Sequence, residues 1–383
     1  MPFFGKDRTL FKIFGIPVKA NLSWLFLVGL VMFTLAEGYF PQKLGDPSVA
    51  LRWGLALIGA MGLFACLLVH ELCHSLVARR TGMPVGGITL FIFGGVSQLQ
   101  DEPPTAPAEF FMALVGPAAS IVLGIGFLVL WFVGRVAGWG DAVLALTQYL
   151  WLINFVLAAF NLMPAFPLDG GRIVRSVLWG ITDDLRAATN VAANIGSFFG
   201  LGLIVLGVIL TLQVDVLGGL WMIVIGFFLR QAAMSSLQMV VIRQQLEGET
   251  VRRFMTTDLV TVPRDISVQE FVDEYVFHHR FSYYPVVEKG GRLLGMVSAR
   301  APRELDNQEW PKRNVQDLME DLDDCTTIHP DMDAVDALSL LREQDTNRAV
   351  VVEGSRAVGM LSLRDLLQFL AVKIDLEPRG SVG

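Results

Sequence analysis

The sequence predicts a multi-pass α-helical membrane bundle of about six transmembrane helices, with a short membrane-associated β segment and a polar α/β region after it. Of the 383 residues, 53% are hydrophobic and only 17% are charged, and the mean hydropathy is +0.52. This composition is too apolar for a soluble protein. The long apolar runs end near residue 240, and the chain is polar and charged from about residue 247 onward. We therefore expect a transmembrane domain at 1–245 and a separate domain after it.

Six apolar runs are each close to the ~20 residues that a helix needs to cross ~30 Å of hydrocarbon. The runs are 22–39, 53–78, 111–134, 143–163, 195–213 and 217–239. Six spans place both termini on one side of the membrane. The loops on that side carry most of the lysine and arginine, whereas the opposite loops carry only Lys43, Arg52 and Arg135. By the positive-inside rule, we expect both termini and the polar region to be cytoplasmic, in a protein of the cell membrane.

The stretch VHELCHSLVARR, at residues 69–80, places three ionisable side chains near the end of the second run. Such groups at membrane depth cost a few kcal/mol and therefore indicate function. His70 and His74 are four residues apart and lie on one face of a helix, where two imidazoles can bind one Zn²⁺ with Glu71 as general base. The alternative is a pair of structural core histidines. It is weaker because the other histidines all lie in the polar region, at His278, His279 and His329.

A third ligand is needed, because catalytic zinc takes three protein ligands and leaves one position for water. The stretch FNLMPAFPLDGGR, at 160–172, contains two prolines that exclude a regular helix and a Gly-Gly pair that permits a tight turn. Non-helical backbone at membrane depth is tolerated where it is buried in protein or lines a wet cavity. Asp169 in this break is the candidate third ligand. The alternative is a loop aspartate paired with Arg172.

The segment MPVGGITLFIFGGVSQL, at 83–99, is rich in β-branched and aromatic residues and punctuated by glycine, which predicts strand rather than helix. Such a segment could offer a sheet edge to an extended substrate, which would add to it as a strand. The alternative is a re-entrant loop that packs on the bundle.

HELCH followed about 95 residues later by N-x-x-P-x-x-P-L-D-G-G resembles the site-2 protease family of intramembrane zinc metalloproteases. FGGV at 93–96 and GPAAS at 116–120 also match, and the resemblance covers roughly residues 1–245. It implies one Zn²⁺ per chain and a catalytic Glu71. The zinc ligands that it implies are His70, His74 and Asp169.

The resemblance also implies two residues near the substrate path, Asn161 and Pro164. The Asn161 amide could bind the substrate backbone or the developing oxyanion, and the alternative is a helix-capping or packing role. The family often has Asn where this chain has Ser120, a difference that we expect to leave the chemistry unchanged. The implied reaction is hydrolysis of peptide bonds in or near transmembrane segments, as in regulated intramembrane proteolysis. A typical client in the family is a single-span regulator such as an anti-sigma factor.

The polar region contains an internal repeat with an offset of 64 residues, which relates GRLLGMVSAR to SRAVGMLSLR. The two copies, at 246–310 and 311–383, resemble tandem CBS domains, which commonly pair and bind adenine nucleotides. The second copy matches the family's ribose motif at Gly359, Ser362 and Asp365. In the first copy Ala301 replaces the aspartate. The resemblance implies regulation by ATP, ADP or AMP and a homodimer; the alternative is a dimerisation module without a nucleotide.

Two other function classes fit part of the sequence. A transporter or channel with CBS regulation would explain polar groups in the bundle, but not HExxH together with a distant P-L-D-G-G. An inactive metal-binding scaffold would usually lack the glutamate, and Glu71 is present. The net charge of −7 gives no indication of a nucleic-acid partner.

Overall fold

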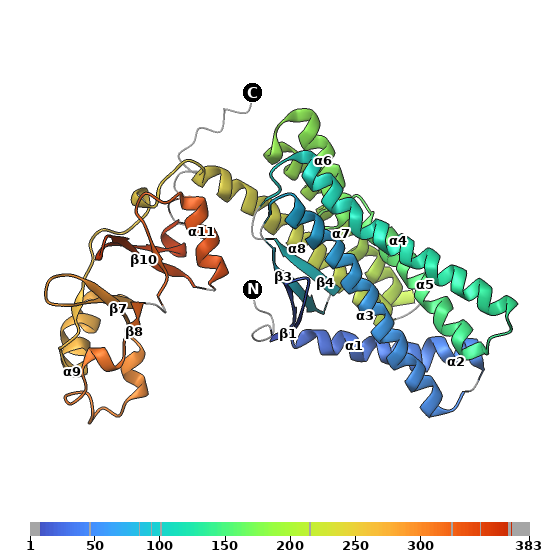
Figure 1. Ribbon diagram of the computed structural model, residues 1–383, viewed down its shortest axis with the longest axis horizontal. Coiled ribbons are helices and arrows are strands. Elements are labelled where there is room, and N and C mark those ends of the chain that lie inside the picture. The colour runs from blue at the N-terminus through green and yellow to red at the C-terminus, as the bar shows by residue number, and fades with distance from the viewer. Residues whose placement is uncertain are drawn as a thin grey trace. The chain divides into compact units, whose positions relative to one another are not determined.

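The computed structural model describes residues 8–45, 47–83, 85–92, 94–99, 102–213, 216–322, 325–344, 346–366 and 369. The chain divides into two compact units, Met1–Val241 and Ile242–Gly383. The boundary falls inside helix α8, Val216–Leu246 (Figure 1). Each unit has hydrophobic clusters of its own.

Long apolar helices build the first unit. The first span is a continuous run of α1 (Ser23–Thr34), a π-helical segment (Leu35–Tyr39) and α2 (Phe40–Leu44). The other long helices are α3 (Val49–Arg80), α4 (Ala106–Val136), α5 (Asp141–Asn161), α7 (Leu185–Gln213) and α8. Within the described ranges, six helices are long and apolar enough to cross a membrane. The predicted multi-pass membrane bundle is therefore confirmed.

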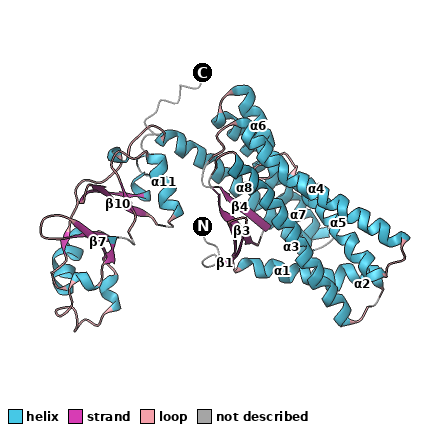
Figure 2. Cartoon of the chain, in the orientation of Figure 1, coloured by secondary structure: helices cyan, strands magenta, loops and turns pink. Residues whose placement is uncertain are grey.

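A four-stranded sheet packs against α3. Its strands are β1 (Arg8–Ile13), β2 (Ile16–Ala20), β3 (Val85–Phe91) and β4 (Gly94–Leu99), in the order β1-β2-β3-β4. Figure 2 shows them beside the helices of this unit. Two antiparallel hairpins are joined by the parallel pair β2 and β3. Within the segment at 83–99, the strand prediction is confirmed for Val85–Phe91 and Gly94–Leu99, whereas the N-terminal hairpin was not predicted.

The sheet packs against α3 through its apolar face. Val18 and Leu90 pack with Phe64 and Leu67 of α3 in one buried cluster. Removing such side chains from water or headgroups is the main favourable term in this packing. As a result, β4 lies at an edge of the sheet and next to the HELCH turn of α3.

A shorter helix, α6 (Asp169–Thr182), follows the bend after α5. The predicted tight turn at Gly170 and Gly171 is wrong, because both glycines lie in the first turn of α6. They are required for close approach instead. A Cβ on Gly170 would lie 2.2 Å from the Leu162 carbonyl oxygen, and one on Gly171 would lie 2.2 Å from the Phe166 nitrogen. The helix can therefore pack directly on the bend, with Asp169 as its first residue.

The second unit consists of two similar halves. One sheet contains β5 (Val262–Pro263), β6 (Tyr283–Val287), β7 (Leu293–Ser298) and β8 (Glu320–Asp321), and the other contains β9 (Thr327–Ile328), β10 (Arg348–Glu353) and β11 (Arg356–Ser362). The helical segments are α9 (Val268–Glu270), a π-helical segment (Phe271–Val276), α10 (Phe277–His279) and α11 (Ala334–Glu343).

The two halves exchange backbone pairs. Glu320, from the second copy of the repeat, pairs with Met296 in β7. Thr256, from the first copy, pairs with Met360 in β11. Both pairs obey the 64-residue offset found in the sequence. The repeat is therefore a pseudo-symmetric pair in which each half completes the other.

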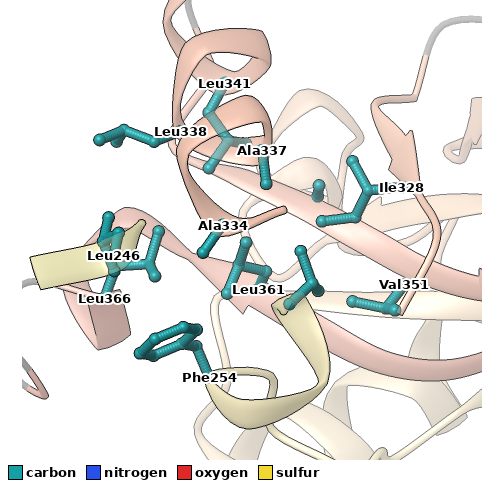
Figure 3. Close-up of a cluster of buried hydrophobic side chains, with 12 residues drawn as sticks. Leu246, Phe254, Ile328, Ala334, Ala337, Leu338, Leu341, Val351, Leu361 and Leu366 are labelled. Atoms are coloured by element: carbon teal, nitrogen blue, oxygen red, sulfur yellow. The ribbon is translucent and has the colours of Figure 1, made fainter. Parts of the chain in front are cut away.

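A buried apolar cluster supports the second half (Figure 3). It joins the end of α8 to α11 and to the strands β9, β10 and β11. Its members include Leu246, Phe254, Ile328, Ala334, Ala337, Leu338, Leu341, Val351, Leu361 and Leu366.

Leu361→Ala should weaken this half, because Leu361 is 0% exposed and its truncation leaves a cavity. Losses of about 2–5 kcal/mol are typical for such a change. Hydrogen exchange of the full-length protein should show faster exchange of the amides in β10 and α11. Leu322→Ala is the matched control, since Leu322 is 38% exposed, and it should leave exchange unchanged. Equal exchange in both variants would contradict the assignment of Leu361 to the core.

Candidate functional site

Three side chains that can bind a metal meet where α3 faces the start of α6. His70 and His74 lie one turn apart on α3, and Asp169 begins α6. The Nε2 atoms of the two histidines are 3.1 Å apart. Asp169 Oδ2 lies 3.2 Å from His70 Nε2 and 3.3 Å from His74 Nε2. These residues form the one such metal-binding group found in the described part of the chain.

The spacing of these atoms fits a tetrahedral zinc ion. Zinc binds nitrogen and oxygen at about 2.0–2.1 Å, so two of its tetrahedral ligands lie about 3.3–3.4 Å from each other. The separations of 3.1, 3.2 and 3.3 Å are close to that value. Two imidazoles and one carboxylate also leave a fourth position for water or substrate, as in catalytic zinc sites.

Helix α4 holds the far side of each imidazole. His74 Nδ1 lies 2.6 Å from the backbone carbonyl oxygen of Met112, and His70 Nδ1 lies 2.9 Å from Ser120 Oγ. A carbonyl can only accept, so His74 donates from Nδ1 and its Nε2 carries the lone pair that a metal needs. Ser120 can accept from His70 in the same way. The sequence did not predict this contact, which places Ser120 directly against one of the candidate ligands.

The close approach of α4 depends on a glycine. A Cβ atom on Gly116 would lie 2.1 Å from His74 Nε2 and 2.7 Å from His70 Nε2. Both nitrogens belong to the group formed by His70, His74 and Asp169, which we call the metal-binding triangle. A residue larger than glycine at position 116 would therefore displace this triangle. Gly116 lies one turn from Met112 and one turn from Ser120 on the same face of α4.

Glu71 lies between α3 and the edge strand β4, and it is 8% exposed. Ser97 Oγ donates a hydrogen bond of 2.8 Å to Glu71 Oε2. A Cβ on Gly95 would lie 2.9 Å from Glu71 Cγ, so the strand passes directly over this side chain. A carboxylate fixed beside a metal-binding group can accept a proton from water. The contact from Ser97 could not be found from the sequence, because nothing in the pattern pairs residues 71 and 97.

The bend between α5 and α6 carries the two residues that the resemblance places near the substrate path. Asn161 ends α5, and its Nδ2 donates a 3.0 Å hydrogen bond to the Leu157 carbonyl one turn earlier. This hydrogen bond fits the helix-capping or packing role that was the alternative for Asn161. Pro164 is exposed in the bend. Both residues thus lie in the segment that leads into Asp169, and the Asn161 amide already has a hydrogen-bond partner.

The second unit contains a cavity of about 910 Å³ that includes two of the predicted nucleotide contacts, Ser362 and Asp365. Gly359 does not line this cavity; a Cβ there would lie 2.7 Å from Met255 Sδ. Ser362 Oγ donates a 2.6 Å hydrogen bond to Asp365 Oδ2, and the Asp365 amide donates back to Ser362 Oγ at 3.1 Å. This reciprocal pair fixes the carboxylate at the cavity wall.

The lining of the cavity also contains aromatic and basic side chains. The guanidinium of Arg348 lies 3.8 Å from the centre of the Tyr283 ring, and both side chains line the cavity. Two further arginines, Arg280 and Arg364, are also in the lining. Aromatic and cationic groups in one cavity with a carboxylate suit a ligand with an aromatic base, a polyol and an anionic group. The sequence motif identified only the carboxylate side.

Gly116→Ala should abolish metal binding, because the added methyl group occupies the space of the two imidazole nitrogens. Zinc content of the purified full-length protein, measured by elemental analysis, should fall from one per chain to near zero. Gly126→Ala on the same helix is the control, since a Cβ there meets nothing within 4 Å. Full zinc occupancy in Gly116→Ala would show that the metal is not held at this triangle.

Comparison with known protein families gives two matches. The model of peptidase family M50 matches residues 58–143 and 131–207. The model of the CBS domain matches residues 251–301 and 315–372.

Individual proteins agree with these matches. The chain is 32% identical over 370 residues to a protein of Synechocystis sp. named "Putative zinc metalloprotease sll0528", with 96% of each chain covered. It is 29% identical over 366 residues to the zinc metalloprotease MJ0392 of Methanocaldococcus jannaschii, covering 95% of this chain and 96% of the relative. The solved site-2 protease from Methanocaldococcus jannaschii aligns with a TM-score of 0.42 at 27% identity, covering 60% of this chain and 94% of that structure. This chain belongs to peptidase family M50, the site-2 protease family of zinc metalloproteases, and carries a tandem pair of CBS domains.

Proposed function

We propose that this metalloprotease hydrolyses peptide bonds in or near the transmembrane segments of membrane-protein substrates, in regulated intramembrane proteolysis. The observation that carries the proposal is the position of the metal-binding triangle. Two of its three residues, His70 and His74, lie on α3, a helix that is long and apolar enough to cross a membrane. A peptidase centre built on a membrane-spanning helix would act on chains that enter the bundle.

In this proposal His70, His74 and Asp169 hold one Zn²⁺ per chain. A bound zinc ion supplies a Lewis acid that polarises the scissile carbonyl and makes water a nucleophile near neutral pH. Glu71 accepts the proton of the attacking water and delivers it to the leaving nitrogen. Ser97 keeps the Glu71 carboxylate in place before the substrate arrives, since its hydroxyl donates to Oε2.

The substrate is bound in an extended form along β4. Helical carbonyls are already bonded within their own helix, so a scissile peptide must first be unwound. Among the described strands β4 pairs only with β3, and its other edge is therefore available to an added strand. Val96 on this strand is 45% exposed. A peptide on this edge would run past Glu71, which supports strand addition over a loop that only packs on the bundle.

Asn161 and Pro164 complete the proposed substrate path at the bend before α6. To reach a substrate, the Asn161 amide would exchange its bond with Leu157 for one with the substrate backbone. Pro164 offers an exposed, donor-free surface beside it. The single-span client that the family resemblance implies, such as an anti-sigma factor, would unwind along this path.

We also propose that the second unit binds ATP, ADP or AMP in its 910 Å³ cavity. Asp365 would accept hydrogen bonds from the ribose hydroxyls through Oδ1, since Oδ2 already accepts one from Ser362. The three lining arginines would hold phosphate, and Tyr283 would face the base. In the first copy Ala301 cannot accept a ribose hydroxyl, so one site should dominate.

Three further parts of the proposal rest on sequence patterns. The positive-inside rule favours a cytoplasmic location for both termini and for the CBS pair. CBS pairing favours a homodimer. A nucleotide would regulate proteolysis only if it binds two conformations of the protein with different affinities.

Glu71→Gln should separate chemistry from metal binding. It removes the proton acceptor but no ligand, so zinc should remain while the cleavage rate falls by about 10²–10⁴. His70→Ala is the comparison variant, and it should lose zinc and cleavage together. Zinc analysis and turnover of a membrane substrate in detergent measure both effects. Cleavage by Glu71→Gln at more than a tenth of the wild-type rate would remove Glu71 from the mechanism.

Asp365→Ala should weaken nucleotide binding by about 10–100-fold, because hydrogen bonds to a charged group contribute about 1.5–3 kcal/mol. Calorimetric titration of the full-length protein with ATP and AMP measures the change. Asp265→Ala, an exposed aspartate outside the cavity lining, should bind as the wild type does. If no nucleotide binds to the wild type, or binding survives Asp365→Ala, the CBS pair is better explained as a dimerisation module.

A further inference from the structure

A buried ion pair joins α6 to α4 near the metal-binding triangle. Arg175 on α6 is 2% exposed and Glu109 on α4 is 0% exposed. Arg175 Nε donates to Glu109 Oε1 at 2.8 Å, and Nη2 donates to the same oxygen. Nη2 also donates to Glu102 Oε2 at 3.1 Å, just before α4 begins.

This pair is not arranged for greatest stability. Burying two charges costs several kcal/mol per ion, and apolar replacements of a buried pair are often equally stable or more so. Within the described structure, Glu109 Oε2 is buried and has no hydrogen-bond partner, so the desolvation cost is not fully offset. The pair therefore calls for a role in geometry rather than in stability.

On α6, Arg175 fixes the bend that leads into Asp169. Its guanidinium lies 5.0 Å from the centre of the Phe166 ring. The backbone of Phe166 is held on two other sides, since a Cβ on Gly171 would meet its nitrogen at 2.2 Å and one on Gly196 would meet its oxygen at 2.0 Å. Phe166 precedes Asp169 by three residues, and Arg175 follows it by six. The arginine thus secures the chain on both sides of the proposed ligand.

On α4, Glu109 belongs to the face that holds the histidines. Glu109, Met112, Gly116 and Ser120 follow the spacing i, i+3, i+7 and i+11, which places them along one stripe of a helix. Met112 and Ser120 contact the Nδ1 atoms of His74 and His70. The stripe that orients the imidazoles therefore ends in the carboxylate that binds Arg175.

We propose that Arg175 and Glu109 are positioning residues that set the distance between Asp169 and the two histidines. The pair locks the helix that starts with Asp169 to the helix that orients His70 and His74. The proposal rests on the proposed role of Asp169 as a zinc ligand. Outer contacts that orient metal ligands typically contribute 10–100-fold to metal affinity or activity.

The test is the double variant Arg175→Met, Glu109→Leu in the full-length protein. It removes both charges together, so no buried charge is left unpaired and the fold should be kept. We expect thermal unfolding of the zinc-free protein close to that of the wild type. Zinc affinity, measured by competition with a chelator, should fall about 10–100-fold, and kcat should fall while KM changes little. Wild-type zinc affinity and kcat in this variant would overturn the proposal.

A second variant covers the case in which the double variant fails to fold. Arg175→Lys keeps the charge opposite Glu109 but loses the two-point guanidinium contact and the planar group over Phe166. It should fold and still show weaker zinc binding and a lower kcat. A lysine variant with wild-type zinc affinity and kcat would also overturn the proposal.

Two controls isolate the inference. Arg52→Met, Glu37→Leu removes another Arg–Glu pair of the membrane helices, whose atoms are 3.2 Å apart, and should leave zinc affinity and kcat unchanged. An equal loss in that control would make the effect general and overturn the positioning role. Asp169→Ala distinguishes a failure of the proposed ligand set from a failure of the positioning role. Unchanged zinc affinity in this variant would reject the proposed ligand set. Weaker zinc binding in Asp169→Ala, but not in the double variant, would reject only the positioning role.

Discussion

The contact of α4 with the two histidines at Gly116 is the constraint on which the rest of the membrane unit depends. No side chain fits between the helix backbone and the imidazole nitrogens. With α4 at this distance, its Met112 carbonyl and Ser120 hydroxyl reach the Nδ1 atoms and leave both Nε2 atoms facing Asp169. A similarly close approach occurs where Gly170 and Gly171 let α6 pack on the bend after α5. The polar centre of an apolar bundle is thus built by close backbone approach.

The membrane context explains why so many contacts hold the three candidate ligands. Ionisable groups are costly in a bundle, and those of this site have partners that fix their orientation. The histidines are held by α4, Glu71 by Ser97 of β4, and Arg175 by Glu109. These contacts come from different elements, so the arrangement of helices and sheet is also the arrangement of the site. Folding and preorganisation of the site are the same event in this unit.

Local patterns made much of the fold and the site predictable. Spans follow from runs of apolar residues, and the facing of His70 and His74 follows from helical periodicity. The N-terminal hairpin was not predicted, since its basic residues also fit a loop that flanks a membrane span. The contacts of Ser97 and Ser120, and the pairing of Arg175 with Glu109, join residues far apart in the chain. No periodicity encodes such pairs, so they appear only when the chain is packed.

The central claim is that two imidazoles and one carboxylate hold zinc inside the bundle. Zinc K-edge X-ray absorption of the purified full-length protein tests it most directly. Zinc held by His70, His74 and Asp169 should show only nitrogen and oxygen neighbours at about 2.0–2.1 Å, with the outer-shell signal of two imidazoles. Cys66 and Cys73 lie on the same helix as the histidines, so a different site would be visible. A sulfur neighbour at about 2.3 Å, or a spectrum without imidazole, would contradict it.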